Sequence, residues 1–191
     1  PYADSEQEEI VLGDTIELDY AIISESKYQK GLLPSAFDAV ALNELWLELL
    51  NTERVERGES PLELDQRLVD SATDWSAYMG DNGSFSHVRP NGQTLLGWIN
   101  SFGYAFTSNG ATDQFGENLA FVYAANSTGG MEGALQDAMD MFMSEESYNG
   151  AHFRNNMDED WNTTGAGFYV DQYSSGLYQI YMTFHFASLE K

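Results

Sequence analysis

The C-terminal end of the chain alternates between large apolar side chains and others, and this pattern constrains the fold more than any other feature. Every second residue of segment 177–187 is apolar, and a period of two predicts a β-strand with one apolar face. Segment 165–170 predicts a partner strand, joined to the first through a turn at 172–176. The apolar face of such a sheet has to be covered, so helices or a second sheet must pack on it.

Helical patterns elsewhere in the sequence predict the elements that cover this apolar face. The longest apolar stripe with helical spacing covers 37–57 and stops at Gly58, and a second helix opens near Asp65 and ends at 81–83. The remaining expected elements are a short helix at 95–99, a strand at 119–123 and a helix at 131–142 whose methionines and leucine face a core. The order predicts an α+β domain with a small, mainly antiparallel sheet.

The domain boundary is expected near residue 38. Residues 1–38 begin with acidic side chains, continue with a β-like run at 10–23 and close in a polar stretch, so we interpret them as an acidic N-terminal extension. Residues 39–191 then form one domain, because no internal repeat or linker interrupts them.

Charge excludes several partners. The chain of 191 residues has 8 Lys and Arg against 31 Asp and Glu, a formal net charge of −23. Nucleic acids and anionic membrane surfaces bind proteins through basic residues, so we expect neither as a partner. No run approaches the roughly 18 apolar residues of a membrane span. A hydrophobic content of 42% nevertheless predicts a folded core. No signal peptide is visible at Pro1, and a start at proline suggests processing of a longer chain.

The chain contains no cysteine, which removes disulfides, thiol nucleophiles and zinc–thiolate sites. A metal would have to be held by carboxylates and by His87, His152 or His185. His185 lies on the less apolar face of the last strand, where a structural hydrogen-bonding role is the preferred interpretation.

Four short segments combine ionisable side chains with turn residues. They are Ser86–His87, Gly116–Ala120, Ser144–Glu146 and Gly150–Asn155. Two histidines and two carboxylates can form a metal site or an acid/base site, but composition alone also fits ordinary loop residues. The common motifs of hydrolases and nucleotide-binding proteins are absent, and Ser86 is a poor nucleophile candidate because sequence neighbours rarely pair with a base.

The order of these segments resembles the CAP superfamily of cysteine-rich secretory, antigen-five and pathogenesis-related proteins, and in particular its cysteine-free, SCP-like bacterial members. The resemblance covers about residues 42–187. It is carried by 50–54 in the first helix, by an apolar second helix, by Ser86–His87, by Gly116–Ala120, by Glu145, by His152 with Asn155 and by an aromatic last strand.

The resemblance implies an α-β-α sandwich with a central cavity into which His87, Glu117, Glu145 and His152 project. In such proteins the cavity can hold a divalent ion, often zinc, between the histidines. Two histidines make a weak zinc site, so we expect an exchangeable ion or none in the isolated protein. Two departures concern the third position: Phe142 stands where a tryptophan is common, and Glu146 competes with Glu145 for the role.

Three functions follow from the resemblance. The preferred one is an extracellular or cell-envelope protein that binds a small molecule, a lipid or a protein without enzymatic turnover. The second is a metal-dependent or acid/base hydrolase of peptidase type, with Glu117 or Glu145 as general base. The third is a structural or adhesive surface module whose acidic exterior confers solubility.

Overall fold

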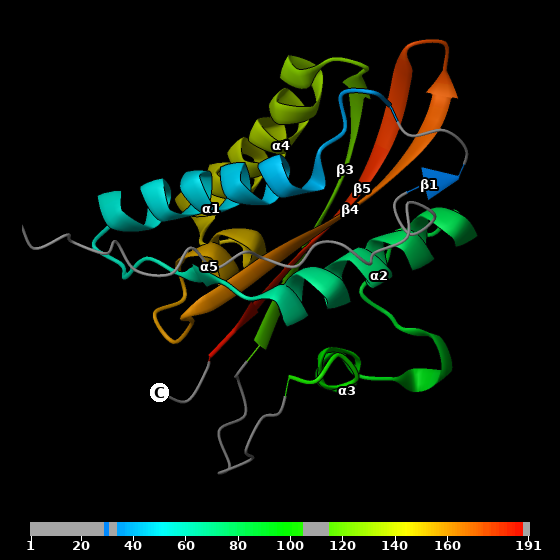
Figure 1. Cartoon of the computed structure of the whole chain (residues 1–191). Helices are drawn as coiled ribbons and strands as arrows, with labels where there is room; N and C mark the ends of the chain where they lie inside the picture. Colours follow the sequence, from blue (N-terminus) through cyan, green and yellow to red (C-terminus); the bar gives the residue numbers. More distant parts are fainter. Residues whose placement is uncertain (1–28, 31–33, 105–114, 189–191) are drawn as a thin grey trace, which may run out of the picture.

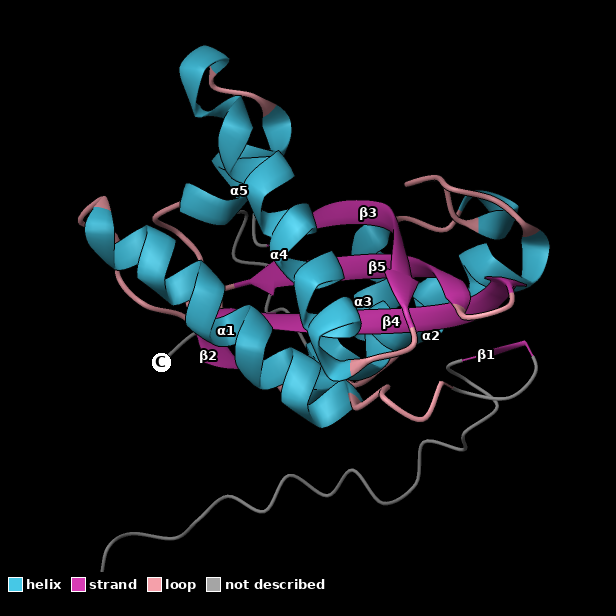
Figure 2. Ribbon diagram, turned by 90° about the horizontal axis from the view of Figure 1, so that it is seen from above, coloured by secondary structure: helices cyan, strands magenta, loops and turns pink. Residues whose placement is uncertain are grey.

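The computed structural model describes residues 29–30, 34–104 and 115–188 of the chain. They form three layers, with a twisted sheet between two helical layers (Figure 1). Helices α1 (Ala39–Glu56) and α4 (Thr128–Met143) pack on one face, and α2 (Gln66–Asn82) and α3 (Leu95–Asn100) lie on the other (Figure 2). The expected α-β-α sandwich is confirmed.

The sheet is mainly antiparallel, as predicted. Its long strands are β3 (Phe115–Ala125), β4 (Thr163–Ser174) and β5 (Leu177–Ala187), and β5 pairs antiparallel with both others. Two short strands, β1 (Gln29–Lys30) and β2 (Glu63–Leu64), pair parallel with β4. The order β1-β4-β5-β3 places β3 at one border of the sheet.

Helix boundaries follow the capping residues of the sequence. The Asp38 carboxylate accepts hydrogen bonds from the N–H groups of Val40 and Ala41 at the start of α1. Asp65 caps α2 in the same way, and Gly83 ends it in the left-handed conformation, with φ of 58°. The expected helices at 37–57 and from Asp65 onward are therefore confirmed.

Two elements were missed or shortened in the sequence-based prediction. Helix α5 (Ala151–Met157) lies where only turn-like residues were noted, and β3 begins at Phe115 rather than at residue 119. A 3-10 helix (Ser144–Tyr148) precedes α5, and another covers Pro90–Gly92. Glu117 and Asn118 near the start of β3 are polar, so the sequence pattern there is not typical of a buried strand. Hydrogen bonds to both side chains allow them to be buried.

The alternation in β5 separates two cores. Its even-numbered residues pack under α1 and α4, where the indole of Trp46 lies 4.1 Å from the ring of Phe184. Its odd-numbered residues lie under α2 instead, so Thr183 and His185 are fully buried as well.

Of the N-terminal extension, the structure describes residues 34–38, which lead into α1, and Gln29–Lys30, which pairs with Val170 and Asp171 of β4. The β-like run at 10–23 lies outside the described residues. None of the described helices has the length and apolar character needed to cross a membrane.

Candidate functional site

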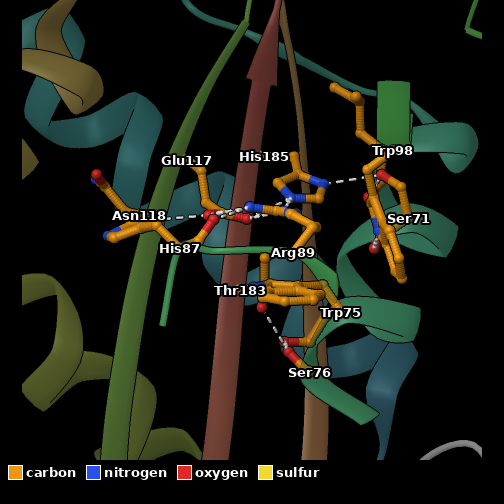
Figure 3. A network of polar contacts seen from close by, with 12 residues as sticks. Ser71, Trp75, Ser76, His87, Arg89, Trp98, Glu117, Asn118, Thr183 and His185 are labelled. Atoms are coloured by element: carbon orange, nitrogen blue, oxygen red, sulfur yellow. Dashed lines mark hydrogen bonds and ion pairs between the residues drawn. The ribbon is translucent and has the colours of Figure 1, made fainter. Parts of the chain in front are cut away.

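A single carboxylate, Glu117, organises one half of the site. It lies on β3, on the face covered by α2, and its side chain is only 2% exposed. The Nδ1 of His87 lies 2.7 Å from Oε1, and the Nε2 of His185 lies 2.9 Å from Oε2 (Figure 3). Arg89 reaches both carboxylate oxygens, with Nη1 2.7 Å from Oε1 and Nη2 on Oε2. Both oxygens of this buried group are therefore fully engaged.

The hydrogen bonds keep Glu117 ionised. Burial by itself raises the pKa of this carboxyl, but hydrogen bonds from His185, His87 and Arg89 outweigh burial and hold the pKa well below its usual range. An ionised carboxylate only accepts hydrogen bonds, so the Nδ1 of His87 carries the proton. In the neutral ring, this tautomer has its lone pair on Nε2.

Arg89 is held between Glu117 and two indole rings. Its guanidinium carbon lies 4.2 Å from the ring centre of Trp75 and 5.9 Å from that of Trp98. The cation is 3% exposed, and Nη1 also donates to the backbone carbonyl of His87 at 3.0 Å. Arg89 thus fixes both the carboxylate and the loop that carries His87.

Behind Glu117 the network ends on helix α2. The Ser71 hydroxyl lies 2.8 Å from Nδ1 of His185, and burial lowers the pKa of that histidine, which favours a neutral ring. Serine, histidine and carboxylate occur in this order in hydrolases, but Ser71 is fully buried and has no access to a substrate. The hydrogen-bonding role expected for His185 is confirmed.

The second half of the site repeats the pairing of carboxylate and imidazole. Oε1 of Glu145 lies 2.8 Å from Nδ1 of His152, and Oε2 accepts the backbone N–H of His152 at 2.9 Å. The ring of Phe142 stacks on the imidazole, with centres 4.8 Å apart. Glu146 instead forms an ion pair with Arg57, 2.8 Å away. The geometry therefore favours Glu145 over Glu146 as the partner of His152.

A glycine makes the close approach of Glu145 possible. A Cβ atom at position 150 would lie 2.3 Å from Oε2 of Glu145 and 2.7 Å from the ring of Tyr148. Any larger residue there would push the carboxylate away from the start of α5, which carries His152. Gly150 thus leaves space for the paired Glu145 carboxylate, where the sequence showed only a turn residue.

Asparagines join the two halves. The side-chain amide of Asn118 on β3 donates to the backbone carbonyl of His152 at 3.1 Å and to the side chain of Asn156 at 2.9 Å. Asn155 on α5 donates to the backbone carbonyl of Glu117 at 3.0 Å. These bonds fix α5, and with it His152, against the strand that carries Glu117.

Both histidines line one cavity of about 240 Å³, together with Phe85, Ser86, Leu119, Ala120, Phe121 and Met141. No described residue hydrogen-bonds to the Nε2 atom of His87 or of His152, so both ring nitrogens remain available to a ligand. Glu117 and Glu145 are not among the lining residues. The structure brings all four predicted residues together as two pairs, with the imidazoles at the cavity and the carboxylates behind them.

The two imidazoles at the cavity are side chains of a type that could bind a divalent ion. Neutral imidazole binds zinc, and a carboxylate on the other ring nitrogen orients the imidazole and increases its basicity. The described part of the chain holds no group of three or more histidine, aspartate or glutamate side chains placed to bind one ion. Two protein ligands would leave the remaining positions to water or to a bound ligand.

The sequence-based prediction of the site did not include Arg89, Ser71 or the asparagines. Only proximity to His87 could have drawn attention to Arg89, one of 8 basic residues in the chain. Ser71 gives no signal, because it meets His185 from 114 positions away.

Comparison with known families decides the classification. The family model described as CAP, the cysteine-rich secretory protein family, matches residues 47–186. The chain belongs to the CAP family. Among curated proteins, none matches it.

Solved structures, two of them named as SCP or CAP domains, share the fold. An extracellular protein containing an SCP domain from Bacillus anthracis str. Ames is 22% identical with a TM-score of 0.56, over 84% of this chain and 45% of that one. The CAP domain of enterococcal PrgA is 18% identical with a TM-score of 0.54, over 80% and 64%. An outer surface protein from Borrelia burgdorferi is 15% identical with a TM-score of 0.51, over 81% and 97%. The CAP domain described here thus spans less than two thirds of the first and second of these proteins.

Proposed function

We propose that this CAP protein is an extracellular or surface binding module whose cavity takes a ligand at His87 and His152, with a divalent cation such as zinc held between the two imidazoles. The observation that carries the proposal is the pair of free Nε2 atoms on one cavity, each on a ring whose Nδ1 is fixed by a carboxylate. The placement outside the cell is supported by the extracellular and outer-surface proteins that share the fold.

Binding is favoured over hydrolysis by the state of the carboxylates. A general base must accept a proton from a bound water, yet both oxygens of Glu117 are occupied and its pKa is far below the range useful to a base. Burial acts to raise the pKa of Glu145, but hydrogen bonds from His152 lower it on balance. An activity on peptides or esters that requires either carboxylate would favour the hydrolase instead.

Zinc titration tests the metal part of the proposal. Calorimetry on the wild-type protein should detect one exchangeable zinc ion per chain, and the double variant His87→Ala/His152→Ala should lose it because both imidazole ligands are gone. Each single variant should bind more weakly than the wild type. Equal zinc binding by the wild type and the double variant would remove the two histidines from the site.

The carboxylates should act through the histidines. Glu145→Gln should weaken zinc binding by about 10–100-fold, the usual effect of losing a carboxylate that orients a metal-binding histidine. Glu146→Gln is the matched control, because the neighbouring carboxylate pairs with Arg57 and should leave zinc affinity unchanged. If both variants changed the affinity equally, overall charge rather than the pairing with His152 would explain the effect.

A further inference from the structure

Among the described strands, β3 forms a border of the sheet, and its second half has no charged residue or proline. It ends the strand order β1-β4-β5-β3 and runs along the outside of the sheet (Figure 2). Native edge strands commonly carry charged residues or proline, which prevent pairing with a strand of another chain. Residues 119–125 read Leu-Ala-Phe-Val-Tyr-Ala-Ala, with neither, in a chain of net charge −23. An uncharged edge in so acidic a protein suggests that something pairs with it.

Alternation along β3 shows which backbone groups point outward. The carbonyl of Glu117 accepts a hydrogen bond from Asn155 on α5, away from β5, whereas the N–H of Asn126 donates to Gly176 on the side of β5. Backbone groups of an edge strand alternate in direction, so the odd-numbered residues point outward. Leu119 is buried, whereas Tyr123 is exposed and Phe121 partly so, and no hydrogen bond from a described residue reaches the outward N–H or C=O of Phe121 or Tyr123. Unpaired N–H and C=O groups of an edge strand form a template on which another strand can pair.

The cavity of the histidines opens onto this edge. Its wall includes Leu119, Ala120 and Phe121, three consecutive residues that face both sides of the sheet, so the cavity wraps around the strand border. Apolar side chains flank the border on both sides: Phe85 is 52% exposed, Tyr123 49% and Met141 45%. A volume of about 240 Å³ is below the roughly 300–1,000 Å³ of typical small-molecule pockets and leaves room for one peptide side chain.

We propose that the edge of β3 binds an extended peptide segment of a partner protein, which adds to the sheet as a further strand and places one apolar side chain in the cavity. Main-chain hydrogen bonds to Phe121 and Tyr123 supply affinity, and the cavity, whose wall includes the buried Leu119, supplies specificity. The proposal shares only the cavity with the proposed function and requires no metal.

Charge selects the kind of peptide. A second copy of the chain would bring together two bodies of net charge −23, which opposes pairing of β3 with itself. A segment with lysine or arginine between its apolar residues is attracted by the same charge. The occupant is therefore a basic, alternating segment from another protein.

A pair of variants at one position separates backbone pairing from side-chain contact. Tyr123→Pro removes the outward N–H, which takes no part in the ladder with β5, so the sheet is retained. Tyr123→Ala removes the same ring but keeps the N–H. The probe is a short fluorescein-labelled peptide of alternating lysine and valine, with a glutamate and valine peptide as charge control. Anisotropy is measured in EDTA at physiological salt.

The lysine peptide should bind Tyr123→Pro about tenfold more weakly than Tyr123→Ala, the effect of one lost hydrogen bond. The glutamate peptide should not bind. Hydrogen exchange on the wild type, which needs no variant to fold, should show slower exchange at the amides of Phe121 and Tyr123 when the lysine peptide is bound.

Equal binding by the two variants, or protection confined to other residues, would overturn the proposal. So would a dimer of the wild type that Tyr123→Pro abolishes, because a second copy would then be the occupant. EDTA removes zinc from this assay, so failure of the metal site and failure of peptide binding are distinguishable.

Discussion

Replacing Arg89 by methionine should lower the free energy of unfolding by about 3–5 kcal/mol, the cost of removing one partner from a buried ion pair. The substitution leaves the Glu117 carboxylate in the interior with only the two histidines as donors. It also removes the cation from the faces of Trp75 and Trp98. Denaturant unfolding followed by tryptophan fluorescence measures the loss.

A double-mutant cycle tests the cause of that loss. Arg89→Met combined with Glu117→Gln should be less destabilised than the sum of the two single variants, because the double variant leaves no unpaired charge in the interior. Arg57→Met is the surface control: it breaks the exposed pair with Glu146 and should cost far less. Strict additivity at positions 89 and 117 would show that packing, not charge pairing, holds Arg89 in place.

The parts of the fold that sequence predicted well are those set by local chemistry. The helix starting after Asp38 and the one starting after Asp65 are fixed by their own capping residues, and β5 by its alternation. Helix α5 has only seven residues and no side-chain cap, so its sequence carries little helical signal. The bonds of Asn118 and Asn155 to neighbouring elements hold it in place.

The candidate site likewise has a part that could be predicted from the sequence and a part that depends on distant residues. The four residues implied by family resemblance do come together, but their roles depend on distant partners. Whether Glu117 faces the cavity or supports a histidine is decided by Arg89 and His185, and the second of these lies 68 positions away. A buried carboxylate surrounded by three donors cannot be recognised before the strands are paired. The family resemblance therefore named four residues that the structure brings together, but not the placement of the carboxylates behind the imidazoles.

Gly167→Ala should destabilise the protein by about 3 kcal/mol, at the upper end of the cost of overpacking a core. A Cβ atom at position 167 would lie 2.0 Å from the backbone carbon of Ala72 and 2.1 Å from the backbone nitrogen of Thr73. Helix α2 rests directly on β4 at this point, so the helix backbone itself would have to move. Helix α2 carries Ser71, which contacts His185, and Trp75, which packs on Arg89. The displacement should therefore also weaken the contacts that hold Arg89 and Glu117 in place.

Gly133→Ala is the matched control for this prediction. Gly133 lies inside helix α4, and a Cβ atom there would meet nothing within 4 Å, so alanine should stabilise the protein by about 0.5–1 kcal/mol through its better helix propensity. The two changes add the same methyl group with opposite expected effects on the free energy of unfolding, measured by denaturant titration. If Gly167→Ala were neutral, α2 would not rest on β4 as closely as the structure shows, and the support of Glu117 from that side would have to be abandoned.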